Sequence, residues 1–199
     1  MTDQGQDPAL EIELSDEDIL DAMKHIQGYV DVFADDFRTI YHLAHRHAVQ
    51  RLTAGLQAAT IMRRDVPDLA PDITLDVAAR FIAQSGYKGL PVVQAGSVVG
   101  MLTETDFLRR LKVSTFLELL LNMMDDGHVF THRCHETPVR DAMSAPAVCV
   151  SADAGFGQIL RSFGQHEGRS APVINAAGTL QGLLLRKDFL TAAHLERLM

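Results

Sequence analysis

The segment of this 199-residue sequence best suited to chemistry is Gly100-Met101-Leu102-Thr103-Glu104-Thr105-Asp106. A helix that begins after Thr103 would present free backbone N–H groups, which bind phosphate well. Thr103 adds a hydroxyl donor, and Asp106, one turn later, can accept hydrogen bonds from both hydroxyls of a ribose. Thr-x-x-Asp is also the spacing of a capping box, which only begins a helix. The segment by itself therefore leaves both interpretations open.

A second candidate segment lies twelve residues upstream, at Lys88-Gly89-Leu90-Pro91. Its backbone would let an adenine ring lie between apolar side chains and be recognised by main-chain groups. Lys88 places a cation beside it. The two segments together predict a nucleotide site.

These segments recur later in the chain. Met62 and Pro91 have counterparts 81 positions on, at Met143 and Pro172, whereas Asp106 has its counterpart 82 positions on, at Asp188. The extra residue falls between turn-forming stretches at 94–97 and 175–179, and a hairpin loop accommodates an insertion easily. The sequence therefore contains an internal repeat.

Both copies predict the same order of elements: strand, helix, strand, strand, helix. A copy of about 50 residues is too small to cover its sheet alone, so we expect the copies to pack on each other. The predicted fold is α/β (α+β), with two βαββα repeats in a pseudo-twofold pair. In copy one we expect a strand at 68–70, a helix from 75 to near 86, strands at 90–93 and 98–102, and a helix from 103. In copy two we expect a strand at 147–150, a helix at 156–163, strands at 171–174 and 180–185, and a helix at 187–198.

Helical additions lie outside the repeat. A capping-box spacing at Ser15 begins a helix that Gly28 would end, and a second helix is expected over 35–52. Between the copies, the pattern predicts a short helix over 116–124 and a polar, His-rich loop over 125–137. The expected domains are 1–55 (helical), 56–112 (copy one), 113–138 (helix and linker) and 139–199 (copy two).

The Gly-x-Pro-Val run at Gly89–Val92, the Gly-x-x-Thr-x-x-Asp run at Gly100–Asp106 and their echoes resemble a pair of CBS domains, the module of cystathionine β-synthase. The resemblance covers about residues 56–111 and 139–195. It implies a pseudo-twofold pair that often forms a homodimer. It also implies clefts that bind AMP, ADP, ATP or S-adenosylmethionine, and regulation of an attached or partner protein without catalysis.

The resemblance implies two unequal sites. Leu185 stands where Thr103 stands in copy one and cannot donate to a phosphate, so we expect the stronger site at Thr103 and Asp106. In copy two, Asp188 keeps the carboxylate, and Arg186 and Lys187 either supply charge to a phosphate or are solvated. The other expected nucleotide-binding residues are Met62, Arg63, Lys88, Gly89, Leu90, Pro91, Met143, Ser144, Arg169, Ala171 and Pro172.

The composition disfavours several classes of protein. The chain has 18 Lys and Arg against 26 Asp and Glu, a net charge of −8, which argues against nucleic-acid and anionic-membrane partners. No apolar run approaches the roughly 20 residues of a membrane-spanning helix. Two cysteines make no disulfide framework, so we expect a cytoplasmic protein. Nucleophile and phosphate-loop motifs are missing, so we do not expect an enzyme.

Two features leave alternatives open. His128, His132 and His135 lie near Cys134 and could ligate zinc or nickel, but their spacing matches no closed zinc motif, so a plain polar loop is the alternative. Met123 and Met124, beside several leucines, either pack in the core or contact a second chain or a regulated partner.

The sequence thus predicts a regulatory protein that senses an adenine nucleotide. The alternatives are a dimerisation scaffold with empty clefts and a metal-responsive switch built on the histidines.

Overall fold

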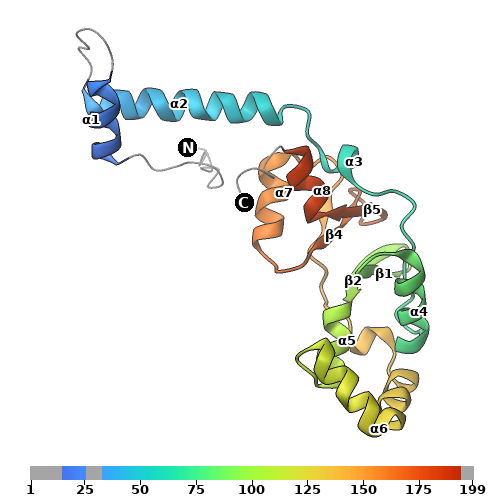
Figure 1. Ribbon diagram of the computed structural model, residues 1–199. Helices are drawn as coiled ribbons and strands as arrows, with labels where there is room; N and C mark the ends of the chain where they lie inside the picture. Colours follow the sequence, from blue (N-terminus) through green and yellow to red (C-terminus); the bar gives the residue numbers. More distant parts are fainter. Residues whose placement is uncertain (1–14, 26–32, 194–199) are drawn as a thin grey trace. The chain divides into compact units, whose positions relative to one another are not determined.

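The computed structural model describes residues 15–25 and 33–193, and the chain divides into two units, 1–55 and 56–199 (Figure 1). The helices of the first unit are α1 (Asp16–Lys24) and α2 (Ala34–Thr53).

Both helices of the first unit were predicted, and local contacts explain them. The Ser15 hydroxyl accepts a hydrogen bond from the N–H of Asp18 at 3.2 Å, which satisfies one free donor at the start of α1. Arg38 of α2 forms an ion pair with Asp16 of α1, which joins the two helices. The predicted stop at Gly28 lies outside the described residues.

Copy one follows the predicted order closely. Its elements are α4 (Leu75–Ser85), β1 (Gly89–Gln94), β2 (Ser97–Thr103) and α5 (Glu104–Leu111). The strands pair as an antiparallel hairpin, with α4 and α5 beside it (Figure 1). Gly86 ends α4 with a left-handed φ of 73°, a conformation that glycine adopts without strain. The strand expected at 68–70 is reduced to one bridge, between Leu69 and Val92.

Copy two has a three-stranded sheet. Its elements are β3 (Val150–Ser151), α7 (Phe156–Gly164), β4 (Ser170–Ile174), β5 (Leu180–Leu185) and α8 (Arg186–Ala192). β3 is parallel to β4, and β4 is antiparallel to β5. Phe189 stacks on Phe156 with ring centroids 5.4 Å apart and lies 6.0 Å from the ring of Phe163, so aromatic rings form the centre of this core. The α+β fold is thereby confirmed.

The segment that opens copy one along the chain is bonded to copy two. It covers residues 56–64 and includes the single turn α3 (Ala58–Ile61). The N–H of Ala58 donates to the carbonyl of Ala154 at 2.9 Å. Arg63 and Leu183 exchange both main-chain hydrogen bonds, at 2.8 and 2.9 Å.

The corresponding segment of copy two is bonded to copy one. It covers residues 137–144 and includes the 3₁₀ turn η1 (Val139–Asp141). Ser144 and Met101 exchange both main-chain hydrogen bonds, each at 2.9 Å, and the N–H of Val139 donates to the carbonyl of Ile73 at 2.8 Å. The copies therefore exchange their opening segments, and each is completed by the other.

This exchange requires glycine at two equivalent positions. A Cβ atom at Gly182 would collide with the backbone oxygen of Arg63, and one at Gly100 would collide with the sulfur of Met143. At Gly182 a larger residue must push the crossing backbone away, whereas at Gly100 it first meets the flexible end of the Met143 side chain.

The predicted loop over 125–137 is wrong. Helix α6 (Phe116–Glu136) does not end near Met124 but continues through this stretch for about three further turns. Polar residues do not oppose a helix when they lie on its solvent side. The side chains of His132 and Glu136 lie 3.2 Å apart, one helical turn from each other, and the side chain of His135 lies 3.1 Å from that of Asp76 in α4.

Within the described residues, no helix has the length and apolarity to cross a membrane.

We expect Gly182→Ala to destabilise the protein by about 1–3 kcal/mol, since the new methyl group meets rigid backbone. Gly100→Ala should cost less, because the side chain of Met143 can turn aside. Thermal unfolding would measure both, at roughly 2–4 °C per kcal/mol. Gly127→Ala in α6, where nothing lies within 4 Å, is the control and should be neutral or stabilising. Equal losses at Gly182 and Gly127 would contradict the close crossing.

Candidate functional site

A cavity of about 440 Å³ lies between the two copies, a size typical of small-molecule sites. Copy one contributes the turn between α4 and β1, and copy two contributes the start of β4, the end of β5 and α8. The lining residues are Gly86, Tyr87, Lys88, Arg169, Ser170, Leu183, Leu185, Arg186, Lys187 and Leu190.

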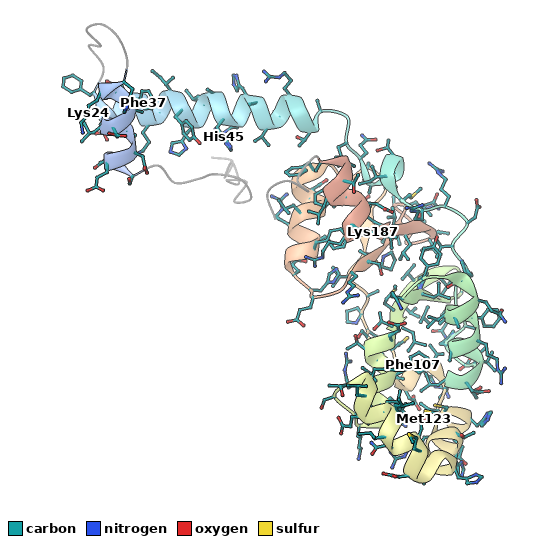
Figure 2. The ribbon with its side chains drawn as sticks, in the orientation of Figure 1. Lys24, Phe37, His45, Phe107, Met123 and Lys187 are labelled. Carbon is teal, nitrogen blue, oxygen red and sulfur yellow. The ribbon has the colours of Figure 1, made fainter. Side chains whose placement is uncertain are left out.

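Four of the lining residues are basic, although the chain as a whole is acidic. Lys88 and Arg169 occupy equivalent positions in the two copies, each directly before the first strand of its hairpin. Arg186 and Lys187 begin α8, where Figure 2 labels Lys187. All four were predicted as nucleotide-binding residues from the sequence, and the structure brings them together.

The four cations differ in how they are held. The guanidinium of Arg186 donates to the carbonyls of Phe163 at 2.8 Å and His166 at 2.9 Å, so it is fixed against the end of α7. The ammonium of Lys88 lies 2.9 Å from a carboxylate oxygen of Glu104. Among the described residues, Arg169 and Lys187 have no acidic side chain at ion-pair distance. Arg169 and Lys187 are therefore two exposed cations of the cavity that no described carboxylate holds in an ion pair.

The rest of the wall is mainly apolar. Its apolar lining residues are Leu183, Leu185 and Leu190 of copy two and the half-buried Tyr87 of copy one. A flat ring bound between leucine side chains and an aromatic ring removes apolar surface from water on both faces. The cavity therefore combines an apolar part and a basic part.

Asp188 lies beside the cavity, directly after Lys187, and is held by the exchanged segment. Arg63 donates to its two carboxylate oxygens, from Nε at 2.7 Å and from a terminal nitrogen at 3.0 Å. These hydrogen bonds lower the pKa of Asp188 below its ordinary value of 3.8, and the positive charges of Arg63 and Lys187 act in the same direction. The side chain of Asp188 is 19% exposed, so solvent reaches it.

The equivalent carboxylate of copy one, that of Asp106, is buried. Asp106 is only 1% exposed. Its oxygens accept hydrogen bonds from the N–H of Thr103 at 2.8 Å, from the Thr103 hydroxyl at 2.6 Å and from the Ser144 hydroxyl at 2.8 Å. Arg109 forms an ion pair with it at 3.2 Å. Thr103 and Asp106 thus begin α5 and tie the crossing segment to copy one.

The family model described as "CBS domain" matches this chain twice, over residues 58–113 and 139–195. The two matches coincide with the two copies and together cover more than half of the sequence. The chain belongs to the CBS-domain family.

Curated relatives are distant and longer. The chain is 25% identical over 132 residues to an inosine-5'-monophosphate dehydrogenase of Thermoplasma acidophilum, which covers 66% of this chain and 22% of that protein. It is 22% identical over 167 residues to the uncharacterized protein MJ1225 of Methanocaldococcus jannaschii, which covers 82% of this chain and 58% of the relative. The chain thus spans less than two thirds of either relative.

Solved structures of CBS proteins share the fold. CBSX2 of Arabidopsis thaliana superposes with a TM-score of 0.59 and 23% identity, over 73% of this chain and 99% of that one. CBSX2 in complex with AMP gives 0.56 and 20%, over 72% and 99%. The CBS domain of a CBS-domain-containing membrane protein from Sphaerobacter thermophilus gives 0.59 and 25%, over 77% and 97%.

The remaining predicted site residues of the CBS pair form its framework. Gly89, Leu90 and Pro91 in β1 are buried, as are Ala171 and Pro172 in β4. Met62 lies against Gly182, and Met143 lies against Gly100. A role of these residues in binding stays a prediction.

Sequence reasoning missed part of the cavity, namely Tyr87, Leu183 and Leu190. The sequence did carry one signal for Tyr87, which directly precedes Lys88 and follows the helix-ending Gly86. An aromatic ring next to a predicted phosphate-binding cation is a candidate for stacking on a base. The leucines match a core pattern and carry no such signal.

The described part of the CBS pair holds no group of three side chains placed to bind a metal ion. His132 and His135 point instead to the carboxylates of Glu136 and Asp76. Burial raises the pKa of the Cys134 thiol, which disfavours the thiolate that a metal would need.

The Arg63–Asp188 pair should give a pH-dependent contribution to stability. Because the pKa of Asp188 is lowered on folding, the contribution is present above about pH 3.9 and is lost as the pH falls through the lower folded pKa. Urea unfolding of Arg63→Gln, Asp188→Asn and the double variant at pH 7 and pH 3 measures it. We expect coupling between the two substitutions at pH 7 that shrinks at pH 3. Arg64→Gln is the control, since Arg64 donates to the backbone of Ala59 and to no carboxylate. A coupling that is the same at both pH values would argue against the pair.

Proposed function

We propose that this CBS pair binds an adenine nucleotide of the AMP, ADP or ATP class in the cavity beside copy two, and regulates a partner protein or its own assembly without catalysis. The observation that carries the proposal is the cavity itself. It has an apolar part for a base and a basic part for phosphate, inside a chain of net charge −8.

The placement of the charges supports phosphate as the anionic group. Lys88, Arg169 and Lys187 come from three different elements and all line one cavity. Arg169 and Lys187 are exposed, so a ligand would gain charge-assisted hydrogen bonds without first breaking an ion pair. The structural likeness to CBSX2, which has been solved with AMP, agrees with an adenine nucleotide as the ligand.

The proposal reverses the order of sites expected from the sequence. Thr103 and Asp106 would have to give up hydrogen bonds to each other and to Ser144 before they could bind a ligand. Asp188 needs only to exchange Arg63 for ribose hydroxyls. Copy two therefore offers the more accessible carboxylate.

Asp188 also suggests how binding is transmitted. Ribose hydroxyls at Asp188 would compete with Arg63, which belongs to the segment that directly follows the N-terminal unit in sequence. Loosening of Arg63 would weaken the hold of copy two on residues 56–64. A ligand shifts such an equilibrium only by its differential affinity for the two states, so binding and release of this segment must be coupled.

A scaffold is the second candidate, and α6 favours it. Its first half exposes large apolar side chains, among them Phe116 at 68% and Met124 at 75%. Core packing, one of the two explanations from the sequence, does not account for these residues. Contact with a second copy or with a partner protein does, and it is compatible with empty clefts as well as with nucleotide sensing.

We expect one of AMP, ADP, ATP, S-adenosylmethionine or NAD to raise the melting temperature by several degrees in a thermal-shift panel, since a ligand that binds the folded state stabilises it. Arg169→Ala should weaken the effective ligand at least tenfold. Arg161→Ala, an exposed arginine of α7 outside the cavity, is the matched control and should bind normally. A flat panel with well-folded protein would favour the scaffold.

A further inference from the structure

The two copies of the CBS pair form the same main-chain hydrogen bond between hairpin and following helix, but they differ in charge there. The N–H of Glu104 donates to the carbonyl of Lys88 at 3.1 Å, and the N–H of Arg186 donates to the carbonyl of Arg169 at 2.8 Å. The same main-chain hydrogen bond thus places Glu104 in copy one and Arg186 in copy two. Each is the first residue of the helix that follows its hairpin.

The following residue enlarges the difference. Thr105 follows Glu104, whereas Lys187 follows Arg186. One formal negative charge in copy one therefore corresponds to two positive charges in copy two. An anion at the copy-one position would approach a carboxylate, and the same anion at the copy-two position would approach two cations.

Glu104 also pairs with Lys88, the cation that copy one contributes to the cavity. Its carboxylate lies 2.9 Å from the ammonium of Lys88, and both side chains are more than half exposed, at 59% and 69%. An exposed pair of this kind contributes little to stability. The consequence of Glu104 is therefore electrostatic, because Arg169, the counterpart of Lys88, has no such carboxylate among the described residues.

We propose that Glu104 is a specificity-determining residue that excludes phosphate from the copy-one cleft, so that the CBS pair binds one nucleotide per chain, beside Lys187. This inference rests on the proposed function, since it concerns where that nucleotide binds. The burial of Asp106 acts in the same direction, because the copy-one carboxylate is not available to a ribose.

Isothermal titration of the full chain, with AMP and ATP as separate probes, tests both proposals distinguishably. Binding of one equivalent per chain supports the inference. Binding of two equivalents in clefts of similar affinity overturns it and leaves the proposed function standing. No binding of either probe, with no stabilisation in the thermal-shift panel, overturns the proposed function itself.

Two matched substitutions then locate the site. Lys187→Glu should weaken binding at least tenfold, whereas Thr105→Glu, at the equivalent position of copy one, should leave the affinity unchanged. Both residues are exposed, so neither change should disturb the fold, and circular dichroism verifies this. A loss with Thr105→Glu and none with Lys187→Glu would place the nucleotide in copy one and overturn the inference.

Glu104→Arg tests the excluding role directly. It gives copy one the residue that copy two has at this position and frees Lys88 from its ion pair. We expect a second, weaker equivalent of nucleotide to bind, while Glu104→Asp keeps one. An unchanged stoichiometry in Glu104→Arg would show that the charge of Glu104 does not exclude the ligand.

Discussion

The main-chain crossing of two short segments holds this structure together. Arg63 pairs with Leu183 and Ser144 pairs with Met101, each through two backbone hydrogen bonds at 2.8 to 2.9 Å. Both crossings pass a glycine that has no room for a side chain. A repeat unit of this size buries too little surface to be stable alone, and the exchange makes the stability of each copy depend on the other. The cavity lies between copies that these crossings hold together.

The same crossings decide the state of the two aspartates. Arg63 and Ser144 occupy equivalent positions, and each side chain reaches the aspartate of the copy on which its segment lies. Ser144 is short, and its partner Asp106 lies in a buried network with Thr103. Arg63 is long and charged, and its partner Asp188 remains partly exposed. The difference between Arg63 and Ser144, together with Thr103 in copy one where copy two has Leu185, thus leaves Asp188 partly exposed and Asp106 buried.

The repeat made most of the fold predictable. Hairpin strands, capped helices and the glycine at the end of α4 depend on local patterns, and these appear in the sequence twice. The continuation of α6 was missed because its polar stretch resembles a loop. The i,i+4 spacing of His132 and Glu136 was a local signal for a helix, whereas the contact of His135 with Asp76 of α4 is not visible in any local pattern. The different exposure of the two aspartates was not predictable either, since it depends on Ser144 and Arg63, which approach their aspartates from far along the chain. A Thr-x-x-Asp pattern indicates that a hydroxyl and a carboxylate are near each other, and it does not indicate whether they face a ligand or bond to one another.

The two copies also differ in the charges that they place near the cavity. Across a chain of net charge −8, an anionic ligand is repelled at long range, but at physiological salt that repulsion decays over about 8 Å. Inside the cavity the nearest charges dominate, and there Arg169 and Lys187 have no carboxylate at ion-pair distance among the described residues, whereas Lys88 is paired with Glu104. Equivalent positions that share one main-chain hydrogen bond can therefore differ in charge. Glu104 stands in copy one where Arg186 stands in copy two, and Thr105 stands where Lys187 stands.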